Sequence, residues 1–198
     1  QGTAAASSAD GAFAFTRMAG CNKLQLDGTT LAGTKKVSVA AGDDSAAKVN
    51  VVGAMASVAE GSLQIAQADA IGAVSVVLGT GNTITASDAA AGTISIAANN
   101  APSLTVKVDD GAAGLAGMGI TAVSAQVGSS GRSLSTSLDA GNGNVFVAPE
   151  VKLTADALAT TTADISAVSV AVGNLQINHN QADNYSDVTV TAGQNQYG

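Results

Sequence analysis

Short segments in which apolar and polar residues alternate recur along the whole chain. Fourteen segments carry the pattern: 12–16, 24–26, 37–39, 63–65, 74–78, 83–85, 93–96, 104–108, 134–138, 145–147, 151–153, 168–170, 175–177 and 188–191. A period of two is typical of strands with one face in a core and one face in water, because successive side chains point to opposite sides. The pattern predicts an all-β fold, and the wet face favours antiparallel sheets.

Turn-forming residues separate these segments, as in Asp27-Gly28, Asp109-Asp110-Gly111 and Gly141-Asn142-Gly143-Asn144. Gly, Asn and Asp tolerate the backbone conformations of tight turns. Many short strands spaced by turns indicate a sandwich, a barrel or a solenoid. We predict an antiparallel β-sandwich of the jelly-roll or immunoglobulin-like kind over residues 19–198, preceded by an arm at 1–18, with a β-solenoid as the alternative.

Internal similarity exists but shows no fixed period. GSLQIAQAD at 61–69 resembles GNLQINHNQAD at 173–183 with two residues inserted, and VSVAAG, ISIAAN and VSVAVG echo one another at uneven spacing. Solenoids usually show a constant period, so this unevenness counts against the solenoid. Two stretches depart from the strand pattern: Gly111–Gly119 is Gly-rich and is expected to be a long loop, and Ala155–Ala163 is expected to form a short helix capped by Thr154.

The composition limits both the core and the partners. With 3 Phe, 2 Tyr and no Trp, small aliphatic side chains must fill the interior, which indicates closely spaced sheets or a narrow solenoid. The net charge of −7, with Lys35-Lys36 as the longest basic run, excludes nucleic acid as a partner. Apolar runs are short and broken by Gly, so no membrane insertion of the chain is expected.

Residues that could carry chemistry are scarce. His179 is the only histidine and Cys21 the only cysteine, and no Ser lies in a G-x-S-x-G elbow. The paired acids Asp43-Asp44 and Asp109-Asp110 fall at turns, where Asp bonds local backbone groups. We therefore expect a protein that is not an enzyme and that uses no metal and no cofactor.

An apolar segment near the N-terminus is the strongest functional candidate. Phe13 and Phe15 alternate with small residues and share one strand face, behind an Ala/Ser-rich lead. Such a strand could dock on an open sheet edge of a neighbouring molecule. The predicted polymerisation residues are Ala12, Phe13, Ala14, Phe15, Thr16 and Met18. In the alternative interpretation, 12–16 is the first strand of its own domain.

Taken together, the 11–16 arm, the Thr/Ser/Ala/Gly-rich strands, the start at Gln1 and the scarcity of reactive residues resemble secreted bacterial surface-fibre subunits of the pilus or fimbrial type. The resemblance is one of class and implies an extracellular or cell-surface homopolymer, built by donation of a terminal strand, with a role such as adhesion or biofilm formation. The chain lacks the cysteine pair of chaperone-assembled pilins. Two alternatives are an adhesin or ice-binding-type module with a surface or matrix ligand, which a regular Thr ladder would support, and a viral decoration or fibre protein.

Overall fold

A computed structural model describes residues 2–129 and 131–198, and the described residues form strands connected by turns and loops. The strands are β1 (Gly2–Leu26), β2 (Thr30–Gly33), β3 (Lys36–Asp43), β4 (Ala46–Leu78), β5 (Thr83–Ala86), β6 (Thr93–Asn100), β7 (Ser103–Val127), β8 (Leu134–Asp139), β9 (Val145–Val147), β10 (Glu150–Ala157), β11 (Thr160–Asn184), β12 (Ser186–Thr191) and β13 (Gln196–Tyr197). All fourteen predicted segments lie inside these strands. The all-β prediction is confirmed.

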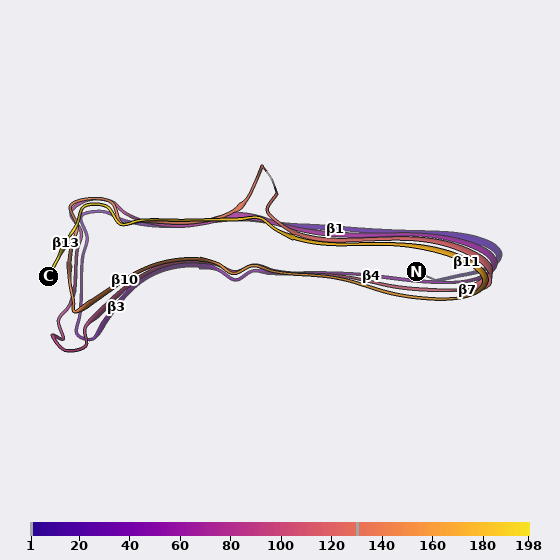
Figure 1. The fold of residues 1–198 in the computed structure, drawn as a ribbon, viewed down its shortest axis with the longest axis horizontal. Helices are drawn as coiled ribbons and strands as arrows, with labels where there is room; N and C mark the ends of the chain where they lie inside the picture. The colour runs from indigo at the N-terminus through magenta and orange to yellow at the C-terminus, as the bar shows by residue number, and fades with distance from the viewer. Residues whose placement is uncertain (1, 130) are drawn as a thin grey trace.

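The strands wind into a flattened parallel β-solenoid (Figure 1). Three parallel sheets run along its axis, in the orders β11-β7-β4-β8-β12 with β1 beside β4, β10-β6-β3, and β13-β9-β5-β2. Two long layers face each other. They are joined at one end by the bends of β4, β7 and β11 and closed at the other by the short strands β2, β5, β9 and β13.

The commonest step from one coil of the solenoid to the next is 57 residues. Lys36 lies opposite Thr93 and Thr93 opposite Glu150, so both steps, 93 − 36 and 150 − 93, equal 57. The same step joins β4 to β7 and β7 to β11, as at Ala46, Ser103 and Thr160. The step is 52 residues between β1 and β4 and between β8 and β12, 53 between β2 and β5, and 62 between β4 and β8, so the length of a coil varies with the insertions between strands.

Stacking places similar side chains above one another. Val37, Ile94 and Val151 occupy one inward row of the sheet β3-β6-β10, and Val39, Ile96 and Leu153 occupy the next. In the middle coils Ile94 and Ile96 are fully buried. Between the long layers the inward residues are small, with Ala66, Ala68, Ala70 and Ala125 at 0–2% exposure. Small side chains therefore fill the space between the two layers.

The predicted antiparallel sandwich is wrong, because every pairing in the structure is parallel. Alternation of apolar and polar residues reports one buried and one solvated face. A solenoid wall has these two faces just as an antiparallel sheet does, so the pattern could not separate the two folds.

Two local predictions are also wrong. Gly111–Gly119 lies within β7, where the strand runs round the bend of the solenoid, and its glycines form no loop. Ala155–Ala163 lies in the ends of β10 and β11 and contains no helix. In both places parallel pairing with neighbouring coils overrides local propensity, because each strand is hydrogen-bonded along its length.

Insertions between the strands hide the period. The segment 87–92 lengthens the second coil, since Gly33 pairs with Ala86 at a step of 53 and Lys36 with Thr93 at a step of 57. The segment 128–133 raises the step from 57 at Ala70 to 62 at Ala73, which lies opposite Ser135. Solenoids tolerate such loops because the loops project away from the stacked walls.

The N-terminal arm of the sequence prediction is part of the first coil. From Gly2 onward it lies in β1, which pairs with β4 along its whole length up to Leu26. Residue 1 lies outside the described residues. Within the part of the chain that the structure describes, there is no helix of the length and apolar character needed to span a membrane.

Candidate functional site

Apolar side chains gather on the outer surface of the layer that contains β1. In this layer every second residue points outward, and the outward residues of successive coils form rows across the strands. One row contains Phe13, Ile65, Ala122 and His179, and the row beside it contains Leu63, Ile120 and Ile177. We call Phe13, Phe15, Leu63, Ile65, Met118, Ile120 and Ile177 the outer apolar patch.

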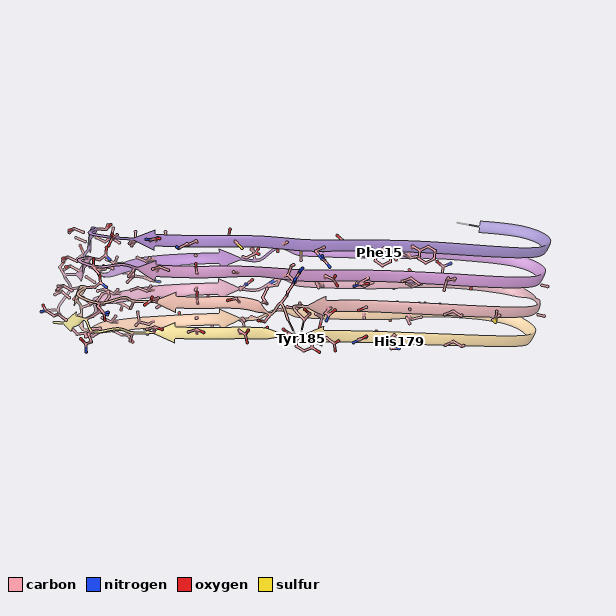
Figure 2. All side chains as sticks on the ribbon, turned by 90° about the horizontal axis from the view of Figure 1, so that it is seen from above. Phe15, His179 and Tyr185 are labelled. Atoms are coloured by element: carbon pink, nitrogen blue, oxygen red, sulfur yellow. The ribbon has the colours of Figure 1, made fainter. Side chains whose placement is uncertain are left out.

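The patch is open to solvent. Phe13 is 58% exposed and Phe15 65%, while Met118, Ile120 and Ile177 are 54%, 38% and 50% exposed. Figure 2 looks down on this face, with Phe15 on the first strand and His179 on the last. Single apolar residues on a surface are ordinary, but contiguous apolar patches on monomeric proteins are often functional.

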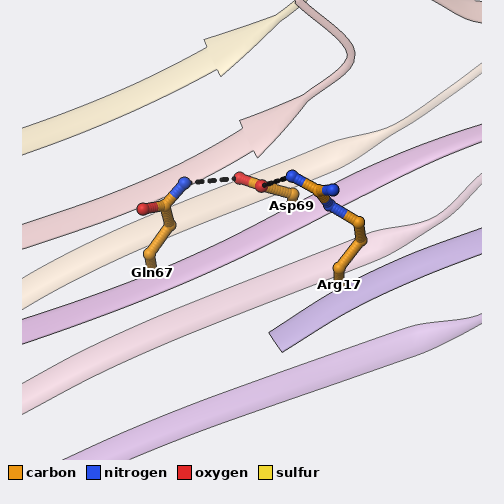
Figure 3. A network of polar contacts seen from close by, with 3 residues as sticks. All are labelled: Arg17, Gln67 and Asp69. Atoms are coloured by element: carbon orange, nitrogen blue, oxygen red, sulfur yellow. Dashed lines mark hydrogen bonds and ion pairs between the residues drawn. The ribbon is translucent and has the colours of Figure 1, made fainter. Parts of the chain in front are cut away.

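A polar border lies along one side of the patch. Arg17 donates to Asp69 across adjacent strands at 3.1 Å, and Gln67 donates to the other carboxylate oxygen of Asp69 at 3.0 Å (Figure 3). With Phe15 and Thr16 these residues line a shallow hollow of about 300 Å³. An apolar centre with a charged border is the usual arrangement of a protein-binding surface.

A loop stands beside the patch. Between β7 and β8, the described residues 128–129 and 131–133 rise from the same outer surface (Figure 1). Mutual backbone hydrogen bonds between Ser129 and Arg132 close the loop, at 2.9 and 3.0 Å. The face is therefore not flat over its whole length.

The six predicted polymerisation residues divide between the two sides of β1. Phe13 and Phe15 point outward, as the sequence indicated. Ala12, Ala14 and Met18 pack against the buried cluster between the layers, and Thr16 is half-buried on the same inward side. All six pair with β4 of the same chain, between Gln64 and Ala70, which matches the alternative interpretation of 12–16 as a strand of its own domain.

A ladder of asparagines, of which Asn82 and Asn144 are buried and Asn195 is half-buried, was missed by the sequence analysis. Asn82, Asn144 and Asn195 stack at the corner between the long layer and the short end sheet. The side-chain Oδ1 of Asn144 accepts from the backbone N–H of Asn82 at 3.0 Å, and that of Asn195 accepts from the N–H of Asn144 at 2.9 Å. The signal was present in the turns Gly81-Asn82, Gly143-Asn144 and Gln194-Asn195, but unequal steps of 62 and 51 residues separated them. The ladder is structural.

The structure does not bring the reactive residues together. His179 shares a row with Phe13, whereas Cys21 lies eight residues farther along β1 in an outward row with Ala73, roughly 26 Å away at 3.3 Å per residue. Asp139 and Asn142 accept hydrogen bonds from backbone N–H groups of Gly141 and Gln194. Among the described residues no group of three His, Cys, Asp or Glu is placed to hold a metal ion.

Comparison with known proteins gives no relative: no protein family, no curated protein and no solved structure matches this chain.

Proposed function

We propose that the chain is a non-catalytic binding module of the adhesin type, exported to the cell surface, and that the outer apolar patch contacts a protein or matrix ligand. The observation that carries the proposal is the 58% and 65% exposure of Phe13 and Phe15 on a paired strand. Two of the three phenylalanines in the chain lie in water rather than in a core short of aromatic residues. Exposed phenylalanine side chains lower the solubility of a protein. Contact of Phe13 and Phe15 with a partner explains why they lie on the surface.

The geometry favours a macromolecular ligand over a flat crystal surface such as ice. Outward rows mix residue types, as in Lys48, Thr105 and Thr162, or Lys36, Thr93 and Glu150, so the regular Thr ladder of an ice-binding face is missing from these rows. The loop at 128–133 would also hold a flat surface away from the patch. A protein ligand can pack around the loop and meet both the apolar centre and the Arg17–Asp69 pair.

The donor-strand version of a filament subunit has less support. Strand donation requires an arm that is free to leave its own domain, and residues 12–18 are hydrogen-bonded into the first coil. The proposal is compatible with a role in extracellular assemblies that form through other surfaces of the solenoid.

The test measures retention of the purified chain on surfaces coated with collagen, fibronectin, mucin or a methyl-terminated monolayer. Phe13→Ser with Phe15→Ser removes the aromatic centre, and Val52→Ser is the matched control, since Val52 is 53% exposed on the opposite layer. We expect retention of the natural chain on at least one coating, about tenfold weaker binding for the Phe variant, and no change for the control. No retention on any coating, or equal loss in both variants, contradicts the proposal.

A further inference from the structure

Four outward side chains on two adjacent strands enclose the shallow hollow beside the outer apolar patch. Phe15 lies opposite Gln67, and Arg17 lies opposite Asp69, in the parallel pairing of β1 with β4. Neighbouring outward residues are about 6.6 Å apart along a strand and about 4.8 Å apart across two strands. The area between the four side chains is therefore close to the size of one six-membered sugar ring.

The side chains around the hollow differ in chemistry. Phe15 is 65% exposed and presents a flat apolar ring to the solvent. The other three, Arg17, Gln67 and Asp69, carry hydrogen-bonding groups. An aromatic ring beside a few convergent polar groups is typical of a small-molecule site, in which the apolar surface gives contact area and the polar groups fix orientation.

The polar side of the hollow is held in place by its own hydrogen bonds. One oxygen of the Asp69 carboxylate accepts from Arg17 at 3.1 Å and the other accepts from Gln67 at 3.0 Å (Figure 3). The side chain of Asp69 is only 16% exposed, whereas that of Arg17 is 59% exposed. A carboxylate can accept about four hydrogen bonds and a guanidinium has five N–H donors, so both groups keep capacity for a ligand. A site ordered in advance lowers the entropy cost of binding.

The charges in the hollow select a neutral ligand. The positive charge of Arg17 and the negative charge of Asp69 cancel, and a phosphate or sulfate group would meet the Asp69 carboxylate. A hydrocarbon chain would cover the polar groups without bonding to them, which is costly. A neutral sugar fits both sides of the hollow, because its ring has an apolar C–H face and its hydroxyl groups both donate and accept.

We propose that this hollow binds a neutral hexose unit of a glycan chain. The C–H face of the sugar packs on the Phe15 ring, and its hydroxyl groups bond to the Asp69 carboxylate and the Arg17 guanidinium. The inference rests on the proposed function, since it names the ligand of the same outer surface. Ser124 and Gln126 of β7 lie opposite Gln67 and Asp69 and continue the polar surface by one strand. The next sugar of an extended chain lies over this second strand gap.

NMR titration of the purified chain tests the sugar site. The ligands are glucose, galactose, mannose, N-acetylglucosamine and the β-linked oligomers of glucose and of N-acetylglucosamine. Phe15→Leu keeps an apolar side chain but removes the flat ring, and Asp69→Asn keeps the shape of the carboxylate but removes its charge. Asp109→Asn is the matched control, because Asp109 pairs with Lys107 at 2.9 Å on the opposite layer. Circular dichroism confirms that each variant is folded.

We expect at least one sugar to shift the backbone signals of the four residues around the hollow. An oligomer should bind more tightly than its monomer and should also shift Ser124 and Gln126. Phe15→Leu and Asp69→Asn should each weaken binding roughly tenfold, and the control should bind as the natural chain does. Shifts for none of these sugars, shifts confined to another surface, or equal weakening in the control overturns the inference.

Retention on coated surfaces separates this inference from the proposed function. If the sugar site is correct, free sugar should release the chain from mucin, and enzymatic removal of the mucin glycans should abolish retention. Phe15→Leu should still be retained on the methyl-terminated monolayer, because leucine is apolar. Retention on mucin that survives removal of the glycans and is insensitive to free sugar overturns the sugar site and leaves the proposed function standing. Shifts at the hollow without retention on any coating contradict the proposed function and support the sugar site.

Discussion

Asn82 and Asn144 lie one above the other at the corner of the solenoid, with the Asn82 Nδ2 donating to the Asn144 Oδ1 at 2.9 Å. Both side chains are fully buried. Asn144 also donates to the carbonyl oxygens of Gly79 and Ala140, at 3.1 and 2.6 Å. These bonds satisfy backbone groups of a turn that has no strand partner at this point, so the ladder fixes where each coil changes direction.

Removal of the central ladder residue should destabilise the fold strongly. Asn144→Ala leaves the backbone N–H of Asn82 and two carbonyl groups without this partner in a buried site, which should cost about 3 kcal/mol of unfolding free energy. Urea denaturation followed by circular dichroism measures the loss. Asn142→Ala is the control, since Asn142 is exposed in the same turn, and it should cost about 1 kcal/mol or less. Equal losses in the two variants would contradict the structural role of the ladder.

The short end sheet contains the one buried aromatic residue among the described side chains. Phe146 is fully buried and stacks on Tyr197, with ring centroids 5.5 Å apart. Phe146→Ala should lower the unfolding free energy by about 3–5 kcal/mol because it opens a cavity. Tyr197 is 55% exposed, so Tyr197→Ala should cost only about 1 kcal/mol. Thermal denaturation of the two variants should reproduce this order, and the reverse order would place Phe146 outside the core.

Strand positions and the exposed phenylalanines could be predicted from sequence, but the winding of the chain could not. Alternation is a local property, so it located the strands and the shared face of Phe13 and Phe15. The winding depends on pairs of residues that are 51 to 62 positions apart, and the insertions at 87–92 and 128–133 shift the similar segments out of a fixed period. The similarity between 61–69 and 173–183 does reflect the stacking of coils. Asp69 and Asp183 are 114 residues apart, which is two steps of 57, and they share a row through Gln126. The two-residue gap in that alignment obscured the match.

The loop between β7 and β8 should be dispensable for folding. In the following coil the single residue Tyr185 occupies the place of residues 128–133, since Val127 lies opposite Asn184 and Leu134 opposite Ser186. Deleting 129–133 leaves Gly128 as a one-residue link and shortens the step between β4 and β8 from 62 to 57 residues. We expect an unchanged circular dichroism spectrum and a melting temperature within a few degrees of the natural chain. Loss of the folded state would contradict the assigned register.

The carboxyl of Glu150 should titrate below its ordinary range. A hydrogen bond and ion pair with Lys152, at 3.0 Å, lower the pKa of Glu150, because Lys152 stabilises the ionised form. Lys152→Met should therefore raise this pKa toward the usual value for glutamate, as measured by NMR titration. Since the pair is exposed to solvent, the melting temperature at neutral pH should not change measurably. A pKa that stays low in the variant would assign the shift to another group.

Disulfide trapping tests the parallel solenoid most directly. Ser38 and Ser95 lie opposite each other on the outer surface of adjacent parallel strands, and the strand spacing of about 4.8 Å permits a disulfide between cysteines at these positions. In a Cys21→Ser background, Ser38→Cys with Ser95→Cys should oxidise to an intramolecular disulfide without loss of structure. Ser38→Cys with Ala97→Cys, two residues out of register on the same face, should oxidise slowly or not at all. Efficient trapping of the first pair alone is the result predicted by a 57-residue parallel coil. Failure of the first pair, or faster closure of the second, would contradict it.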